Sequence, residues 1–227
     1  MASSSTPGWF GKVSMLGDFA SRRLAPEWVE ACDRWLSAGI DASQRQLGEG
    51  WTAAYVSAPV WHFAWAPGVI DTHWWFGVLM PSSDSVGRYF PLVVAQSRPA
   101  PPADRFSLDH LELWWRYVGD AALRTLTTDA RLETFEDDLL EAPPWPITMP
   151  APTVHVLPLP GGERVSLDRV APLDDFLHGL ATMSLLQRLT GCSVWLPHSV
   201  ANAATSCTVA KGLPAPDAFS ALFTGQW

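Results

Sequence analysis

Charged residues are scarce in this sequence, and acidic residues outnumber basic ones. Asp, Glu, Lys and Arg make up only 17% of the 227 residues, and the formal net charge is −8. An acidic surface disfavours binding to nucleic-acid phosphates and anionic lipids, although it leaves room for a local basic patch. Hydrophobic residues make up 48% of the chain. The composition therefore excludes a disordered or collagen-like protein and predicts a packed core that does not bind nucleic acid.

Cysteine is scarce as well. The three cysteines, Cys32, Cys192 and Cys207, cannot all pair with one another. No CxxC spacing occurs, which excludes a zinc ribbon and a thioredoxin-type redox motif. Cys192 and Cys207 could face each other across a hairpin, but buried thiols in a reducing cytosol are the favoured interpretation.

A secretion signal is missing from the N-terminus. Residues 1–7 have neither a basic start nor an apolar run, and we expect a disordered tail there. The uncharged stretch 52–70 approaches the roughly 20 residues of a transmembrane helix, but Pro59, His62 and Pro67 interrupt it. A buried strand flanked by turns explains this stretch better, so we expect a soluble cytoplasmic protein with no membrane insertion.

Common catalytic and cofactor motifs are also missing. The sequence contains no GxxxxGKS or GxxxxGKT, no GxGxxG after a predicted strand, no HExxH and no GxSxG. Its six histidines are scattered, with no pair at i, i+4. We therefore predict neither a metal nor a cofactor, and we assign no catalytic residue.

Tryptophan, by contrast, is abundant, at 13 residues, and without interleaved Lys or Arg these rings are better explained as core than as a base-stacking platform. Three runs between residues 60 and 95 are almost continuously apolar, so both faces of their sheet should be covered by helices. The short loops between these runs favour antiparallel neighbours. Helices are predicted over 26–47, 51–56, 108–123, 132–140, 172–186 and 219–223, and strands over 8–13, 60–65, 74–80, 89–95, 154–157, 192–196 and 205–210.

The domain organisation follows from a proline-rich stretch at residues 142–162, the best candidate for a linker. The part of the chain after it is too short and too poor in strands to close a core of its own. We therefore predict a single domain over residues 8–227.

Two polar positions stand out in the apolar first half. Asp18 lies in a Gly17-Asp18-Phe19 turn, where its carboxylate is expected to cap backbone amides. The loop Ser82–Arg88 should be fastened by an Asp84–Arg88 ion pair, with Gly87 adopting a positive φ. The alternative for this loop is a hydroxyl nucleophile, but a serine needs a base beside it that sequence cannot place.

The acidic run between residues 133 and 141 could attract a basic partner. An ordinary solvated helix face is the commoner meaning of such a run.

Several ordered motifs resemble one protein family. These are Gly8-Trp9-Phe10-Gly11-Lys12 with Gly17-Asp18-Phe19, Pro59-Val60-Trp61-His62-Phe63, Trp75-Phe76-Gly77-Val78-Leu79-Met80-Pro81-Ser82, Asp84-Ser85-Val86-Gly87-Arg88-Tyr89-Phe90-Pro91-Leu92 and, near the end, Gly225-Gln226-Trp227. On these motifs the chain resembles the TagF/ImpM family of type VI secretion-associated proteins. The likeness is weak over residues 99–191, and Trp195-Leu196 stands where the family tends to carry consecutive tryptophans.

The resemblance implies a fold and a function. The family fold is a three-layer α/β/α sandwich, here with a mixed, largely antiparallel central sheet. The family's implied role is that of a bacterial, cytoplasmic accessory protein that represses type VI secretion after translation. The implied partner is a forkhead-associated scaffold protein of the threonine-phosphorylation pathway, bound without any catalysis.

The candidate partner-binding residues follow from the family-like motifs: Gly17, Asp18, Phe19, Asp84, Gly87 and Arg88. Two alternatives stay open at this point. One is a hydrolase that uses the Ser82–Arg88 loop, and the other is a structural component associated with the secretion baseplate.

Overall fold

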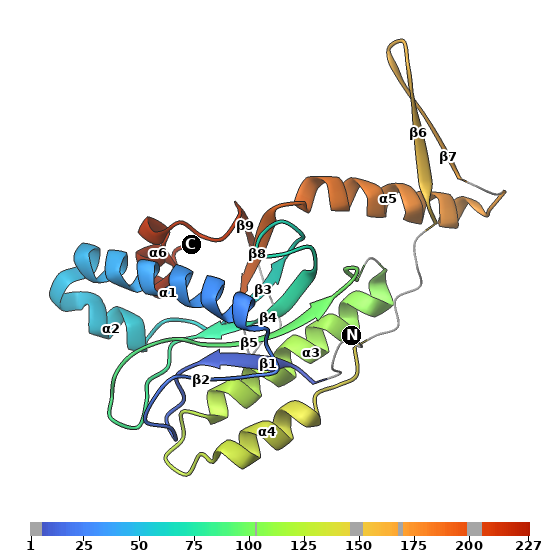
Figure 1. The fold of residues 1–227 in the computed structure, drawn as a ribbon. Coiled ribbons are helices and arrows are strands. Elements are labelled where there is room, and N and C mark those ends of the chain that lie inside the picture. The colour runs from blue at the N-terminus through green and yellow to red at the C-terminus, as the bar shows by residue number, and fades with distance from the viewer. Residues whose placement is uncertain (1–5, 103, 146–151, 168–169, 199–205) are drawn as a thin grey trace.

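A seven-stranded sheet forms the middle layer of the molecule (Figure 1). The computed structural model describes residues 6–102, 104–145, 152–167, 170–198 and 206–227. The sheet order is β2-β1-β5-β4-β3-β8-β9, and all pairings between these described strands are antiparallel. Its strands are β1 (Gly8–Gly11), β2 (Ala20–Arg22), β3 (Trp61–Trp65), β4 (Trp74–Met80), β5 (Leu92–Arg98), β8 (Cys192–Pro197) and β9 (Thr208–Lys211). The predicted largely antiparallel α/β fold is confirmed.

Helices cover both faces of this sheet. On one face lie α1 (Pro26–Leu47), α2 (Trp51–Val56) and α6 (Phe219–Thr224), with the short 3-10 turns η1 (Gly48–Gly50) and η2 (Pro216–Ala218). On the other face lie α3 (Arg105–Arg124) and α4 (Leu132–Leu140). The remaining helix, α5 (Leu173–Leu189), extends away from the sheet and is accompanied by a separate hairpin of β6 (Val154–Leu159) and β7 (Gly162–Leu167) (Figure 1).

The apolar runs form strands because both sides of each strand meet a helical layer. All seven residues of β4 are buried. In β3, Trp61 and Phe63 belong to the core under α1, whereas Ala64 belongs to the core under α3. Successive side chains of a strand point to opposite faces, so a strand buried on both faces needs apolar residues at every position. The continuous apolar runs in the sequence are therefore a consequence of the three-layer architecture.

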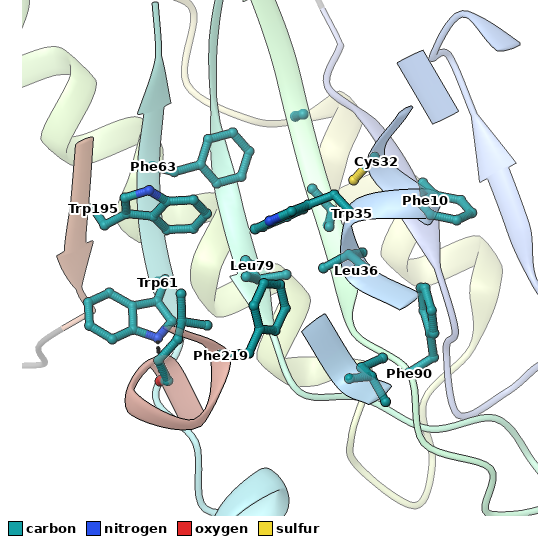
Figure 2. Close-up of a cluster of buried hydrophobic side chains, with 14 of the residues drawn as sticks. Phe10, Cys32, Trp35, Leu36, Trp61, Phe63, Leu79, Phe90, Trp195 and Phe219 are labelled. Atoms are coloured by element: carbon teal, nitrogen blue, oxygen red, sulfur yellow. Dashed lines mark hydrogen bonds between the residues drawn. The ribbon is translucent and has the colours of Figure 1, made fainter. Parts of the chain in front are cut away.

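Tryptophans fill much of the core. Ten of the 13 are less than 9% exposed. Figure 2 shows Trp35 of α1 among the rings of Trp195 from β8 and Phe219 from α6, with centroid distances of 5.9 and 5.1 Å. The indole N–H of Trp61 donates to the carbonyl of Leu222 at 3.0 Å, and that of Trp35 donates to Pro214 at 2.8 Å. The rings fill the core, and their N–H groups also bind the C-terminal segment to β3 and α1.

Two predicted strands begin several residues later in the structure, and two further strands are present that were not predicted. The strand predicted at 205–210 is observed as β9, Thr208–Lys211. The strand predicted at 89–95 begins only at Leu92, because Tyr89 makes an isolated bridge with Ser83 and Pro91 has no amide hydrogen to donate. The ladder between β1 and β5 starts at the Gly11–Leu92 pair. Neither β2 nor β7 was predicted, since both are short and mostly polar segments without an apolar run.

The cysteines are all free, but only Cys32 is buried. Cys207 is exposed, which corrects the expectation of buried thiols. A pairing of Cys192 with Cys207 is also excluded by register, because Cys192 lies opposite Lys211 at one end of the β8–β9 ladder and Cys207 precedes its other end at Thr208.

Residues 1–5 of the predicted tail lie outside the described residues, as do residues 146–151 of the predicted linker. Pro7 is buried, and its carbonyl accepts a hydrogen bond from Nε of Arg23 at 2.8 Å. None of the described helices has the length and apolar character needed to cross a membrane.

Gly39 provides a test of how closely α1 packs on α6. A Cβ built on Gly39 would lie 2.4 Å from ring carbons of Phe219, a fully buried residue. We expect Gly39→Ala to lower the free energy of unfolding by about 1–3 kcal/mol through overpacking, in spite of alanine's higher helix propensity. Gly50→Ala is the matched control, because a Cβ there meets nothing within 4 Å. Urea unfolding of both variants checks this, and equal stabilities would contradict the packing described.

Candidate functional site

Two loops that are distant in sequence meet at one end of the sheet. Because β1 pairs with β5, the chain leaving β1 (residues 12–19) lies beside the chain entering β5 (residues 81–91). The Arg88 guanidinium donates a hydrogen bond to the Gly17 carbonyl at 2.5 Å across this junction. The six predicted site residues, Gly17, Asp18, Phe19, Asp84, Gly87 and Arg88, therefore lie on two segments in contact.

Asp84 is the centre of the junction, and its side chain is fully buried. One carboxylate oxygen accepts from the amides of Val86 and Arg88 at 3.1 and 2.9 Å. The other faces Nε of Arg88 at 2.7 Å, as predicted, and Nζ of Lys12 at 3.0 Å. Burial by itself would raise the pKa of this carboxyl, but the hydrogen bonds from Arg88, Lys12 and Val86 outweigh burial and hold the pKa well below its usual range. Gly87 has a φ of 82°, and its amide closes the turn on the Asp84 carbonyl.

Lys12 completes this arrangement, a role that was not predicted from the sequence. It is only 5% exposed, and its ammonium lies 3.4 Å from the Arg88 carbonyl and 4.8 Å from the centroid of the Phe19 ring. A buried lysine requires a charge partner, and Asp84 supplies it from the other loop. We call Lys12, Gly17, Phe19, Asp84 and Arg88 the Asp84 cluster. A single lysine directly after the uncharged aromatic strand β1 was the available signal.

Asp18 and Phe19 differ in what they do. The carboxylate of Asp18 accepts from the adjacent Phe19 amide at 2.8 Å on the exposed surface, which fits a turn residue. Phe19 is 48% exposed, and its ring packs edge-on against Phe90 at 4.8 Å and stacks on Phe10 at 6.4 Å. The exposed part of this ring is the largest apolar feature of the predicted turn.

Ser82 of this loop is poorly placed for nucleophilic chemistry. Ser82 is 4% exposed, and its backbone amide and carbonyl both bond to the hydroxyl of Tyr55. Burial raises the pKa of that phenol. A nucleophile must be reachable by substrate and must have a base beside it, and Ser82 is enclosed by the protein.

A histidine pair lies elsewhere in the molecule. Nδ1 of His198 is 3.0 Å from Nε2 of His62, and the His62 ring stacks on Trp115 with a centroid distance of 5.4 Å. Nε2 of His198 faces the Asp120 carboxylate at 3.7 Å. Gly119 leaves room for the pair, since a Cβ there would come within 3.4 Å of His198. The two histidines are 136 positions apart in sequence, so no local pattern could have revealed the pair.

The surroundings of His62 keep it uncharged. Burial, followed by the neighbouring charge of His198, lowers the pKa of His62 to about 3. Within the described parts of the chain, no group of three or more His, Cys, Asp or Glu is placed to hold a metal ion.

Comparison with known proteins places these features in context. A family model described as the TagF N-terminal domain, type VI secretion system-associated, matches residues 8–142. Among solved structures, the chain is similar to PA0076 from Pseudomonas aeruginosa PAO1, with 36% sequence identity and a TM-score of 0.74. That similarity covers 97% of this chain and 94% of PA0076. A search of curated proteins found no match. All residues of the Asp84 cluster fall inside the matched region.

The charge pairing in the Asp84 cluster can be tested by a double-mutant cycle. Asp84→Asn should lower the unfolding midpoint by several degrees, because it leaves the Lys12 ammonium buried without a counter-charge. Adding Lys12→Met should recover part of that loss, since it removes the unpaired charge. Asp109→Asn, at an exposed ion pair with Arg105, is the control and should change little. Losses at Lys12 and Asp84 that simply add would show that the two groups are not coupled.

His62 should make the protein sensitive to acid. Its folded-state pKa of about 3 lies below the unfolded value of 6.5, so between these pH values the unfolded chain binds a proton that the folded chain does not. The unfolding free energy should therefore fall as pH decreases from 6.5 towards 4. His62→Gln should make this fall shallower. Denaturant unfolding at several pH values measures both slopes, and identical slopes for wild type and His62→Gln would contradict the assignment.

Proposed function

The chain belongs to the TagF family of type VI secretion system-associated proteins, and on that premise we propose that it represses secretion by binding a forkhead-associated scaffold protein. The family resemblance is the ground for this partner and for a cytoplasmic place of action. The proposed binding makes and breaks no bond. It holds the scaffold away from productive assembly and thereby regulates secretion after translation.

The observation that carries the proposal is the joining of two motif segments into one shaped surface. Asp84 holds both loops together from inside the protein, and the outward side chains include three large apolar or aromatic ones: Phe19 is 48% exposed, Val86 70% and Tyr89 39%. Asp18 and Ser85 are exposed beside them. The Arg88 side chain is 57% exposed. Aromatic residues and arginine are enriched at protein interfaces and supply many of their strongest contacts. This surface has the chemistry of a protein-binding patch.

The closed polar network supports binding over catalysis. The oxygens of Asp84 are already occupied by four donors, and Lys12 is buried against them. Ser82 is buried as well. Groups that are saturated and enclosed hold a surface in shape but are not available to a substrate. This arrangement favours the scaffold-binding proposal over a hydrolase that uses the same loop.

Calorimetric titration with the forkhead-associated protein encoded beside the secretion genes tests the proposal. Val86→Asp places a charge at the most exposed apolar position of the patch and should weaken binding by at least about tenfold. Asp18→Ala and Arg88→Ala probe the two segments separately. Leu140→Asp is the matched control on α4, where the replaced side chain is 63% exposed.

The outcomes distinguish a wrong binding surface from a wrong repressor mechanism. If wild-type protein binds the scaffold and only Leu140→Asp weakens it, the contact lies on the acidic helix α4 and not on the Asp84 cluster. If folded wild-type protein does not bind the scaffold at all, the proposed repressor mechanism is wrong. Co-purification with the assembled baseplate would then support the structural alternative.

A further inference from the structure

A groove runs along the free edge of the sheet, between β2 and the first turns of α1. It has a volume of about 480 Å³ and is lined by residues from β1, β2 and α1, together with Phe19 and Leu24 on either side of β2. We propose that it binds an extended segment of a partner protein that carries a bulky apolar side chain flanked by Lys or Arg. This inference rests on the proposed function, because it names the chemistry that a partner of this surface would present.

The floor of the groove is aromatic. The rings of Phe10 and Phe19 stack at a centroid distance of 6.4 Å with an interplanar angle of 16°. Phe10 is only 5% exposed, whereas Phe19 is 48% exposed and also belongs to the Asp84 cluster. Leu24 and Val29 complete the apolar lining. An apolar side chain entering the groove would cover the part of Phe19 that water now reaches, and burial of apolar surface is favourable.

The wall of the groove is a second stripe of α1. Pro26, Val29, Glu30 and Asp33 all line it, and their spacing of i, i+3, i+4 and i+7 places them on one face of the helix. Val29 also packs against the core under α1, whereas Glu30 and Asp33 lie outside that core. Along the groove the wall changes from apolar to acidic.

The groove is acidic because the nearby arginines, Arg22 and Arg23, form ion pairs outside it. Trp9 lies opposite Arg22 and Phe10 lies opposite Ser21 in the β1–β2 register. Successive residues face opposite sides, so Ser21 faces the groove and Arg22 faces away from it.

The partner of those arginines is an acidic residue of α4. Arg22 and Arg23 approach Glu136 at 3.3 and 2.5 Å. On the groove side, Glu30 meets Arg34 only in an exposed pair at 3.6 Å, and such pairs are weak. Among the described residues Asp33 has no ion-pair partner. Lys or Arg of a bound segment would supply the missing counter-charges.

The edge strand gives the expected ligand its conformation. Among the described strands β2 is terminal in the sheet and pairs only with β1. An exposed edge can accept a further strand, whose alternate side chains then point to the same face. Ser21 lines the groove from this edge. A segment that pairs with β2 would therefore direct every second side chain into the groove.

The experiment uses a fluorescein-labelled peptide of seven residues with Lys, Phe and Lys at the second, fourth and sixth positions and Thr elsewhere. The control peptide carries Glu in place of Lys. We expect saturable binding of the Lys peptide to the full chain, measured by fluorescence anisotropy. Glu30→Lys with Asp33→Lys should weaken that binding by about tenfold or more. Asp41→Lys, the same charge change at an exposed position further along α1, should leave it unchanged.

The position of the bound peptide is checked by hydrogen exchange, which should slow at β2 when the Lys peptide is present. Equal binding of the Lys and Glu peptides, equal affinity of the Glu30/Asp33 variant, or no saturable binding would overturn the inference. Scaffold binding is measured in parallel on the same proteins. If the scaffold binds but the Lys peptide does not, the inference about the groove is wrong and the proposed function is retained. If the Lys peptide binds but the scaffold does not, the groove is a peptide-binding site and the scaffold is not its partner.

Discussion

Trp61, Phe63 and Trp65 of β3 pack under α1, while Ala64, between the last two, packs under α3. The same alternation holds along β4, all of whose residues are buried. A sheet that is buried on both faces cannot have a polar side on its central strands, and each of its large rings must fit against a helix. The position of every helix around the sheet follows from this double burial. The indole donors of Trp35 and Trp61 also bring the C-terminal segment onto the same face, because a buried N–H needs an acceptor.

Polar groups also gather in the loops at the ends of the strands. At one end, Asp84 is buried among donors from two loops. A buried carboxylate is unfavourable unless it is paired and hydrogen-bonded. The donors that Asp84 needs come from both loops, and these bonds hold the loops together. As a result, the Phe19 ring is kept at the surface beside Lys12, and the same ring forms part of the groove along β2. The Asp84 cluster and the groove are thus adjacent and share the Phe19 side chain.

The groove and the histidine pair show how the two faces of the sheet differ. On the face of α1, the acidic residues Glu30 and Asp33 line the groove, because Arg22 and Arg23 turn to Glu136 on the other face. On the face of α3, His62 is enclosed by Trp115 and His198 and has a lowered pKa. At β2, strand register therefore decides which layer receives the Arg22 side chain, since neighbouring residues of a strand point to opposite layers.

The sequence by itself determined what is local. The helix at 26–47 and the strand at 74–80 were predicted with their observed bounds, because helical spacing and continuous apolar runs act over neighbouring residues. The Asp84–Arg88 pair and the positive φ of Gly87 were predicted for the same reason. Only the tertiary structure decided that Lys12 completes the Asp84 cluster, that His62 meets His198 and that a groove lies along β2. These contacts depend on which strands become neighbours, β1 with β5 and β3 with β8. These strand pairings depend on the packing of the whole chain, so the sequence of any one segment does not reveal them.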